Sequence, residues 1–69
     1  MKELKYSRIH IKRRLKTYAR RLGSINEDID NVIALLLEEG NRDWAVKFAY
    51  LAESIKITQD LIEKLAEEL

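Results

Sequence analysis

Apolar residues recur along this chain at intervals of three and four, the spacing that places side chains on one face of an α-helix. In the first third, this stripe consists of Leu4, Ile11, Leu15, Tyr18 and Leu22. The most regular stripe follows a four-three alternation near the end of the chain: Trp44, Phe48, Leu51, Ile55, Thr58, Ile62, Leu65 and Leu69. The pattern predicts an all-α protein.

The two glycines of the chain divide these periodic stretches. Gly23 precedes Ser24 and Glu27, which have the spacing of a capping box that opens a new helix. Gly40 precedes Asn41, a favoured N-cap residue. Glycine just past a helix takes the left-handed conformation without steric cost, so both positions are predicted helix ends.

These breaks predict a three-helix bundle formed by a single helical domain over residues 1–69. We expect helices at about 3–22, 25–39 and 42–68. Joints of one or two residues make successive helices antiparallel neighbours.

The predicted third helix is too long for such a bundle. At 1.5 Å per residue it would run about 40 Å, against roughly 22 Å for the second helix. Its last turns would leave an apolar stripe uncovered, and exposed stripes of that size mark interfaces. We therefore expect a homodimer, or a protein partner, held by the third helix. The candidate interface residues are Tyr50, Ile57, Leu61, Ile62 and Leu65.

The charged residues of the chain are unevenly distributed, with an excess of bases near the start and an excess of acids in the remainder. Residues 1–22 carry nine lysines and arginines against one acid, a net charge of +8, whereas residues 23–69 carry four bases against eleven acids, −7. The overall charge of +1 hides this asymmetry. A contiguous basic surface of this kind points to a polyanion or an acidic partner.

The bases of the first helix lie opposite its apolar stripe, interleaved with an aromatic residue. Cations contact phosphates and release counterions, and a ring can stack on a base. We expect a small non-enzymatic nucleic-acid-binding or regulatory accessory protein, dominated by phosphate contacts. The candidate residues are Lys5, Tyr6, Arg8, Lys12, Arg13, Lys16, Arg20 and Arg21.

Two other functions fit the same charges. The basic face could dock an acidic protein, which would make the chain a protein–protein adaptor. Alternatively, the bases could pair with acids on neighbouring helices in a designed or orphan helical scaffold that has no ligand. A charged fraction of 36% without proline or cysteine fits a thermostable or designed helical protein.

A minor alternative begins with a strand. In Tyr6–Lys12, Ile9 and Ile11 alternate with polar residues, as in a short strand. Followed by Leu22-Gly23 and the run from Asp28 to Glu39, this segment resembles ribbon-helix-helix repressors. The resemblance implies a dimer whose N-terminal strands read the major groove, with Arg8, His10 and Lys12 directed toward DNA.

The composition argues against several other classes of function. His10 is the one histidine, and no cysteine is present to complete a zinc site. No glycine-rich phosphate loop occurs, and no serine has an evident histidine and acid to activate it. We therefore expect no enzyme activity, no cofactor and no metal. The longest apolar run, Val32–Leu37, is too short to span a bilayer, and no signal peptide is evident, so we expect a cytoplasmic protein without a membrane partner.

Overall fold

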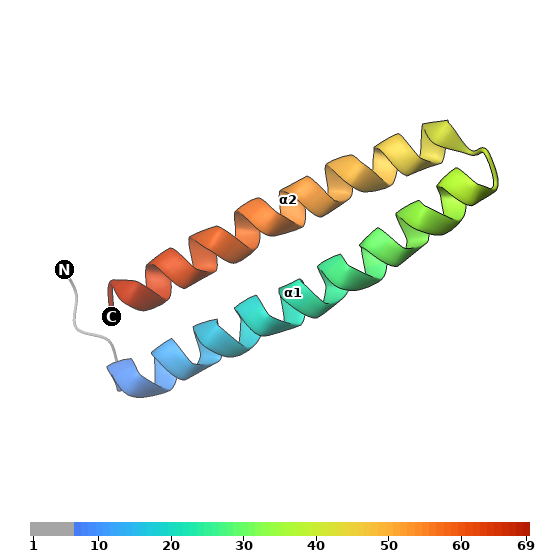
Figure 1. The fold of residues 1–69 in the computed structure, drawn as a ribbon. Helices are drawn as coiled ribbons and strands as arrows, with labels where there is room; N and C mark the ends of the chain where they lie inside the picture. Colours follow the sequence, from blue (N-terminus) through green and yellow to red (C-terminus); the bar gives the residue numbers. More distant parts are fainter. Residues whose placement is uncertain (1–6) are drawn as a thin grey trace.

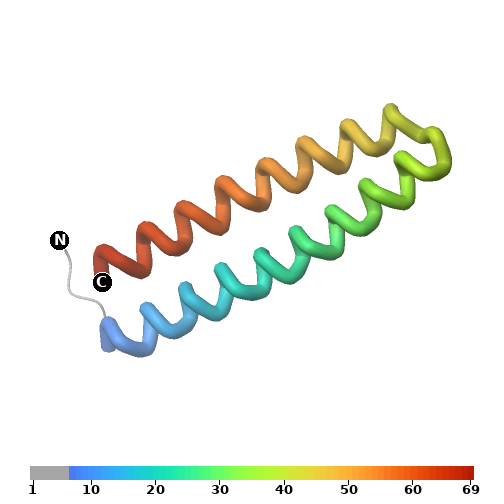
Figure 2. The backbone as a smooth tube through the Cα atoms, viewed as in Figure 1, coloured from blue at the N-terminus to red at the C-terminus, as the bar shows by residue number. Residues whose placement is uncertain are grey.

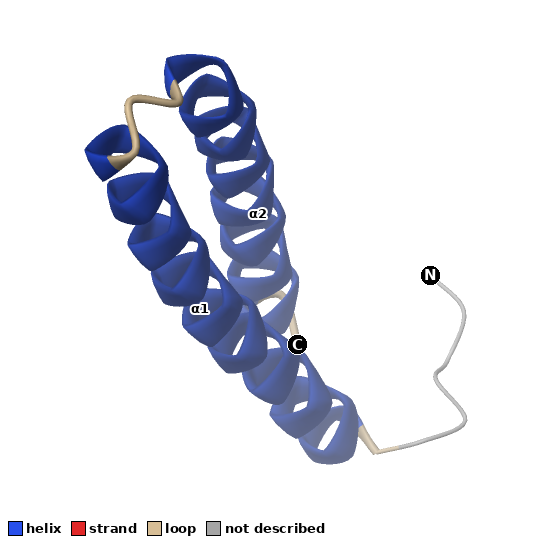
Figure 3. Ribbon diagram, turned by 90° about the vertical axis from the view of Figure 1, so that its right-hand side faces the viewer, coloured by secondary structure: helices blue, strands red, loops and turns tan. Residues whose placement is uncertain are grey.

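The computed structural model describes residues 7–69, which form two long helices, α1 (Arg8–Glu38) and α2 (Arg42–Glu67), joined by a short turn. The helices run antiparallel, so that the end of α2 lies beside the start of α1 (Figures 1 and 2). They also lie side by side when the molecule is turned by 90° (Figure 3). The protein is therefore a helical hairpin, 52 Å long. The predicted three-helix bundle is wrong.

The error lies at Gly23, where the predicted helices 3–22 and 25–39 are in fact one helix. Among the described residues, Gly40 alone has a positive φ, at 75°, so Gly23 does not end a helix and Ser24 does not cap one. A side chain at Gly23 would place its Cβ 3.2 Å from Nε2 of Gln59 on α2. The glycine leaves room there for Gln59 to pack against the α1 backbone.

The apolar register also continues through Gly23 without interruption. We use the term seam for the interhelical series that repeats at alternating steps of four and three, and all its members are buried or half-buried. It consists of Leu15, Ala19, Leu22, Asn26, Ile29, Ile33 and Leu36 from α1 and Ala45, Phe48, Ala52, Ile55, Gln59, Ile62, Ala66 and Leu69 from α2 and its end. Every residue of α2 outside this series is exposed. Packing along one continuous seam outweighs the local preference of glycine for a helix end.

Large and small side chains face one another across the seam. Three alanines, Ala19, Ala45 and Ala66, are among its most buried residues, with 3–5% of their surface exposed. Residues of the two helices that are equally far from the turn lie at the same height along the hairpin, and we call them level. Four level pairs join a large and a small residue: Leu36 with Ala45, Ile29 with Ala52, Ala19 with Ile62, and Leu15 with Ala66. A small residue opposite a large one lets the two backbones approach and fills the space between them.

The turn at Gly40 has the geometry that the sequence predicts. The Asn41 amide donates to the Leu36 carbonyl at 2.8 Å, and the Gly40 amide donates to Leu37 at 3.0 Å. This is a Schellman motif with glycine in the left-handed position. The Asn41 side chain then accepts from the Trp44 amide at 3.4 Å, so the predicted N-cap is confirmed.

The start of α1 excludes the alternative strand within the described residues. Ser7 is the N-cap, and its hydroxyl accepts from the His10 backbone N–H at 3.2 Å. Residues 8–12 are therefore helical rather than extended. The ribbon-helix-helix prediction is wrong at this segment, because its predicted strand residues Arg8, Ile9, His10, Ile11 and Lys12 belong to α1.

Alanine substitutions at the two glycines should have opposite effects on stability. Gly23→Ala should raise the free energy of unfolding by about 0.5 kcal/mol, because alanine favours a helix interior and the Gln59 amide needs to shift only slightly. Gly40→Ala should lower it by about 1 kcal/mol, because an L-residue is strained at this positive φ. Urea unfolding followed by circular dichroism measures both. Equal destabilisation by both variants would instead support a helix break at Gly23.

Candidate nucleic-acid interface

The first four turns of α1 carry a concentrated positive charge. Between residues 8 and 21 the chain has seven bases and no acid: Arg8, Lys12, Arg13, Arg14, Lys16, Arg20 and Arg21. All except the half-buried Lys12 are exposed. They cover about 20 Å of helix, at the end of the hairpin where the start of α1 lies beside the end of α2 (Figure 1).

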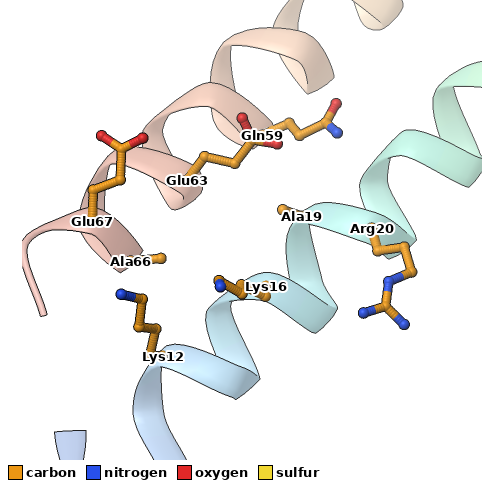
Figure 4. Close-up of a pocket in the computed structure, with 8 residues that line it drawn as sticks. All are labelled: Lys12, Lys16, Ala19, Arg20, Gln59, Glu63, Ala66 and Glu67. Atoms are coloured by element: carbon orange, nitrogen blue, oxygen red, sulfur yellow. The ribbon is translucent and has the colours of Figure 1, made fainter. Parts of the chain in front are cut away.

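Acids from α2 oppose these bases on only one side. Lys12, Lys16 and Arg20 border a shallow groove between the helices, and Glu63 and Glu67 of α2 line the same groove. In Figure 4, Lys12 reaches toward the end of α2 whereas Arg20 points away from that helix. The positive potential is therefore strongest on the outer side of α1.

We call the five exposed bases between residues 13 and 21 the basic face: Arg13, Arg14, Lys16, Arg20 and Arg21. Arg13 and Arg20 are seven residues apart, as are Arg14 and Arg21. Each pair is therefore stacked along one side of the helix, with its Cα atoms about 10.5 Å apart. The result is a compact block of four guanidinium groups with a lysine at its edge.

None of these bases forms an ion pair within residues 7–69. The ion pair found there joins Lys56 Nζ to Asp60 Oδ1 at 3.9 Å, one turn apart on α2. The interpretation that the N-terminal bases hold helices together by pairing across them is therefore not supported by the described structure. The charge of the basic face remains available to an external anion.

The structure brings most of the predicted nucleic-acid residues together. Arg13, Lys16, Arg20 and Arg21 lie on the basic face, with Lys12 at its inner edge and Arg8 one turn before it. Lys5 and Tyr6 lie outside the described residues. The prediction omitted Arg14, whose signal was its repeat at Arg21, seven residues later.

The predicted interface residues of α2 lie on three different surfaces. Tyr50, Ile57 and Leu61 are on the outer side of the helix, away from α1, and Tyr50 is 71% exposed. Ile62 belongs to the seam, and Leu65 lies on a flank beside it. The length argument behind this set no longer applies, because α1 (31 residues) is long enough to cover α2 (26 residues) from end to end.

The described residues offer few other kinds of site. No three histidine or acidic side chains in residues 7–69 lie close enough together to hold a metal ion. Neither α1 nor α2 is long and apolar enough to cross a membrane. The basic face is the strongest candidate site on this part of the chain.

Comparison with known proteins adds no relative. No family model matches the chain, and no curated protein or solved structure is significantly similar to it. Any function must therefore be inferred from the residues of the hairpin itself.

Proposed function

We propose that this protein binds nucleic acid through the basic face of α1, chiefly by contacts to phosphates. One observation carries the proposal: five exposed bases share one helical surface, and none is paired with an acid of the described chain. A phosphate backbone supplies closely spaced negative charges that such a surface can neutralise with release of counterions. The proposal includes the cytoplasmic location that we expect from the sequence.

The composition of the basic face favours phosphate over a generic anion. Four of its five bases are arginines, whose planar guanidinium groups bind phosphate oxygens through two hydrogen bonds at once. An α-helix also fits the major groove of duplex DNA. Because contacts to phosphates carry no sequence information, we expect weak sequence preference and a regulatory or accessory role.

The direct test is a binding titration of labelled duplex DNA, duplex RNA and single strands, followed by fluorescence anisotropy. If all five bases contact phosphates, affinity should fall several hundred-fold between about 50 and 200 mM salt. No binding at the lower salt concentration, or binding that does not respond to salt, would refute the proposal.

Carboxylates can also bind guanidinium groups, so the same titration needs an acidic polypeptide as competitor. Polyglutamate of matched total charge represents the acidic partner of an adaptor protein. Nucleic acid should be displaced only at a large excess of polyglutamate, because its flexible carboxylates lose more conformational entropy on binding. Displacement at equal charge would favour the adaptor function instead.

A further inference from the structure

A second surface of the hairpin is apolar and has no cover within the described residues. It lies on one flank of the seam and repeats every seven residues along each helix. We call it the apolar face: Ile11, Tyr18, Ile25 and Val32 from α1, and Trp44, Leu51 and Leu65 from α2. Thr58 occupies the remaining position of the α2 series. Five of the seven apolar members are classed as exposed, including Leu51 at 47%.

Both helices present these residues on the same side of the hairpin. Each member except Ile11 directly precedes a seam residue in the sequence, as Tyr18 precedes Ala19 and Leu51 precedes Ala52. In an antiparallel pair these matching flanks meet on one side. Away from the turn the opposite flank is polar, as Lys16 and Glu63 show where they border the groove of Figure 4, whereas near the turn Leu37 and Ala49 make it apolar.

Near the turn, the apolar face has a fixed aromatic anchor. The Trp44 and Phe48 rings meet edge to face, with centroids 6.3 Å apart. Lys47 Nζ lies 4.5 Å from the centroid of the Trp44 ring, on the helix surface. These two contacts favour one orientation of the indole, half of which remains exposed, and tryptophans of this kind often dominate interfaces.

We propose that a second copy of this chain covers the apolar face and completes a four-helix bundle. The face spans two helices, is about 39 Å long over the 26 residues of α2 and 18 Å wide, and so has a projected area of roughly 700 Å². Stable interfaces bury about 800 Å² on each partner, so the area is close to what a dimer needs. Among residues 7–69, only three alanines and Ile29 are buried in the single hairpin, with 3–8% of their surface exposed.

The charges favour a dimer whose two turns lie at opposite ends. The half of the hairpin at the chain ends (8–23 and 58–69) has eight bases and four acids, a net charge of +4. The half at the turn (24–57) has three bases and seven acids, −4. Opposite orientation places each positive half on a negative half, whereas two turns at the same end would place like charges together.

Charged residues at the rim of the apolar face support the same orientation. When the two hairpins are centred on one another, Lys47 of one copy is level with Glu68 of the other. Arg21 then lies within about one helical turn of Asp28 of the second copy. The same-end arrangement sets only Arg14 level with Glu68. The proposed interface leaves Arg13, Lys16 and Arg20 outside, so nucleic-acid binding and dimerisation can be tested separately.

The oligomeric state and one pair of variants test the interface. Sedimentation equilibrium should show a dimer for the native chain at about 100 µM. Leu51→Glu should raise the dimer dissociation constant at least about 100-fold, because the interface gains two buried charges. Ile57→Glu, with the same change on the outer side of α2, should leave it within about threefold. A monomeric native chain, or dissociation by Ile57→Glu alone, would overturn the proposal.

Spin labels on the otherwise native chain test the orientation without disturbing the apolar face. The chain has no cysteine, so Glu38→Cys places one label near each turn. With the hairpins centred on one another, labels at opposite ends should lie roughly 45 Å apart, given the helical rise of 1.5 Å per residue. Labels at the same end would lie within about 20 Å, two helix spacings, and would overturn the orientation. Ser24→Cys, near mid-length, should give a short distance in either case and confirms that a dimer is present.

Discussion

Replacing Arg13 and Arg20 together by glutamine should weaken binding to duplex DNA roughly 50-fold at about 0.1 M salt. Both side chains are exposed on the basic face, and the described structure shows no acid paired with either. Each lost phosphate contact should also reduce the slope of log affinity against log salt by about 0.9, so the slope should fall by nearly two. The measurement is anisotropy over a series of salt concentrations.

The matched control removes two charges from the other half of the hairpin. Arg42→Gln combined with Lys56→Gln changes the net charge by the same amount, at residues that are also exposed. We expect this control to change the affinity less than about threefold, since long-range attraction is largely screened beyond 8–10 Å. Equal losses in both double variants would mean that binding follows net charge rather than the basic face.

The same double variant should leave the fold intact. Glutamine and arginine have similar helix propensities, and neither arginine makes an ion pair within residues 7–69. The free energy of unfolding should therefore change by less than about 0.5 kcal/mol. A larger loss of stability would show that these bases support the hairpin, as the scaffold alternative predicts.

Ile29→Ala should cost about 2–3 kcal/mol of unfolding free energy, a large part of the stability available to a chain of this size. Ile29 is the most buried large side chain among the described residues, with 8% of its surface exposed. It lies level with Ala52, which is too small to fill the resulting cavity. Urea unfolding at a fixed protein concentration gives the value.

The control for this variant is the same substitution on the outer surface. Ile57 is 61% exposed and lies away from α1, so Ile57→Ala should change stability by less than about 0.5 kcal/mol. Similar losses at both positions would mean that the outer side of α2 is buried in the folded state. That result would restore the predicted interface around Tyr50, Ile57 and Leu61.

Local sequence signals predicted one turn correctly and one wrongly. At Gly40 the apolar register is reset, because the seam positions before and after the turn, Leu36 and Ala45, are nine residues apart. At Gly23 the register continues unchanged, from Leu22 to Asn26 and Ile29. Glycine and a capping box alone could not distinguish these cases, whereas continuity of the register across the glycine could have done so.

The basic face could be predicted from sequence more readily than the apolar surfaces. A run of bases without acids remains charged whichever fold it adopts, so locating it required only the helical period. Assigning the apolar residues required knowledge of the packing partner. Three of the eight seam positions of α2 and its end are small residues, Ala45, Ala52 and Ala66, whereas the predicted stripe contained their larger neighbours Trp44, Leu51 and Leu65. Tyr18 belongs to the predicted apolar stripe of the first helix, but it is 42% exposed on the apolar face.

The most direct measurement is a map of amide chemical-shift changes when the isotope-labelled protein is titrated with duplex DNA. We expect the largest changes within residues 8–21, centred on Arg13 and Arg20, and little change around the acidic turn at residues 27–43. Addition of salt should reverse them. Changes centred on the turn or on the apolar face would contradict a binding site on α1. So would the absence of any change, or equal DNA binding by the native chain and a basic-face variant.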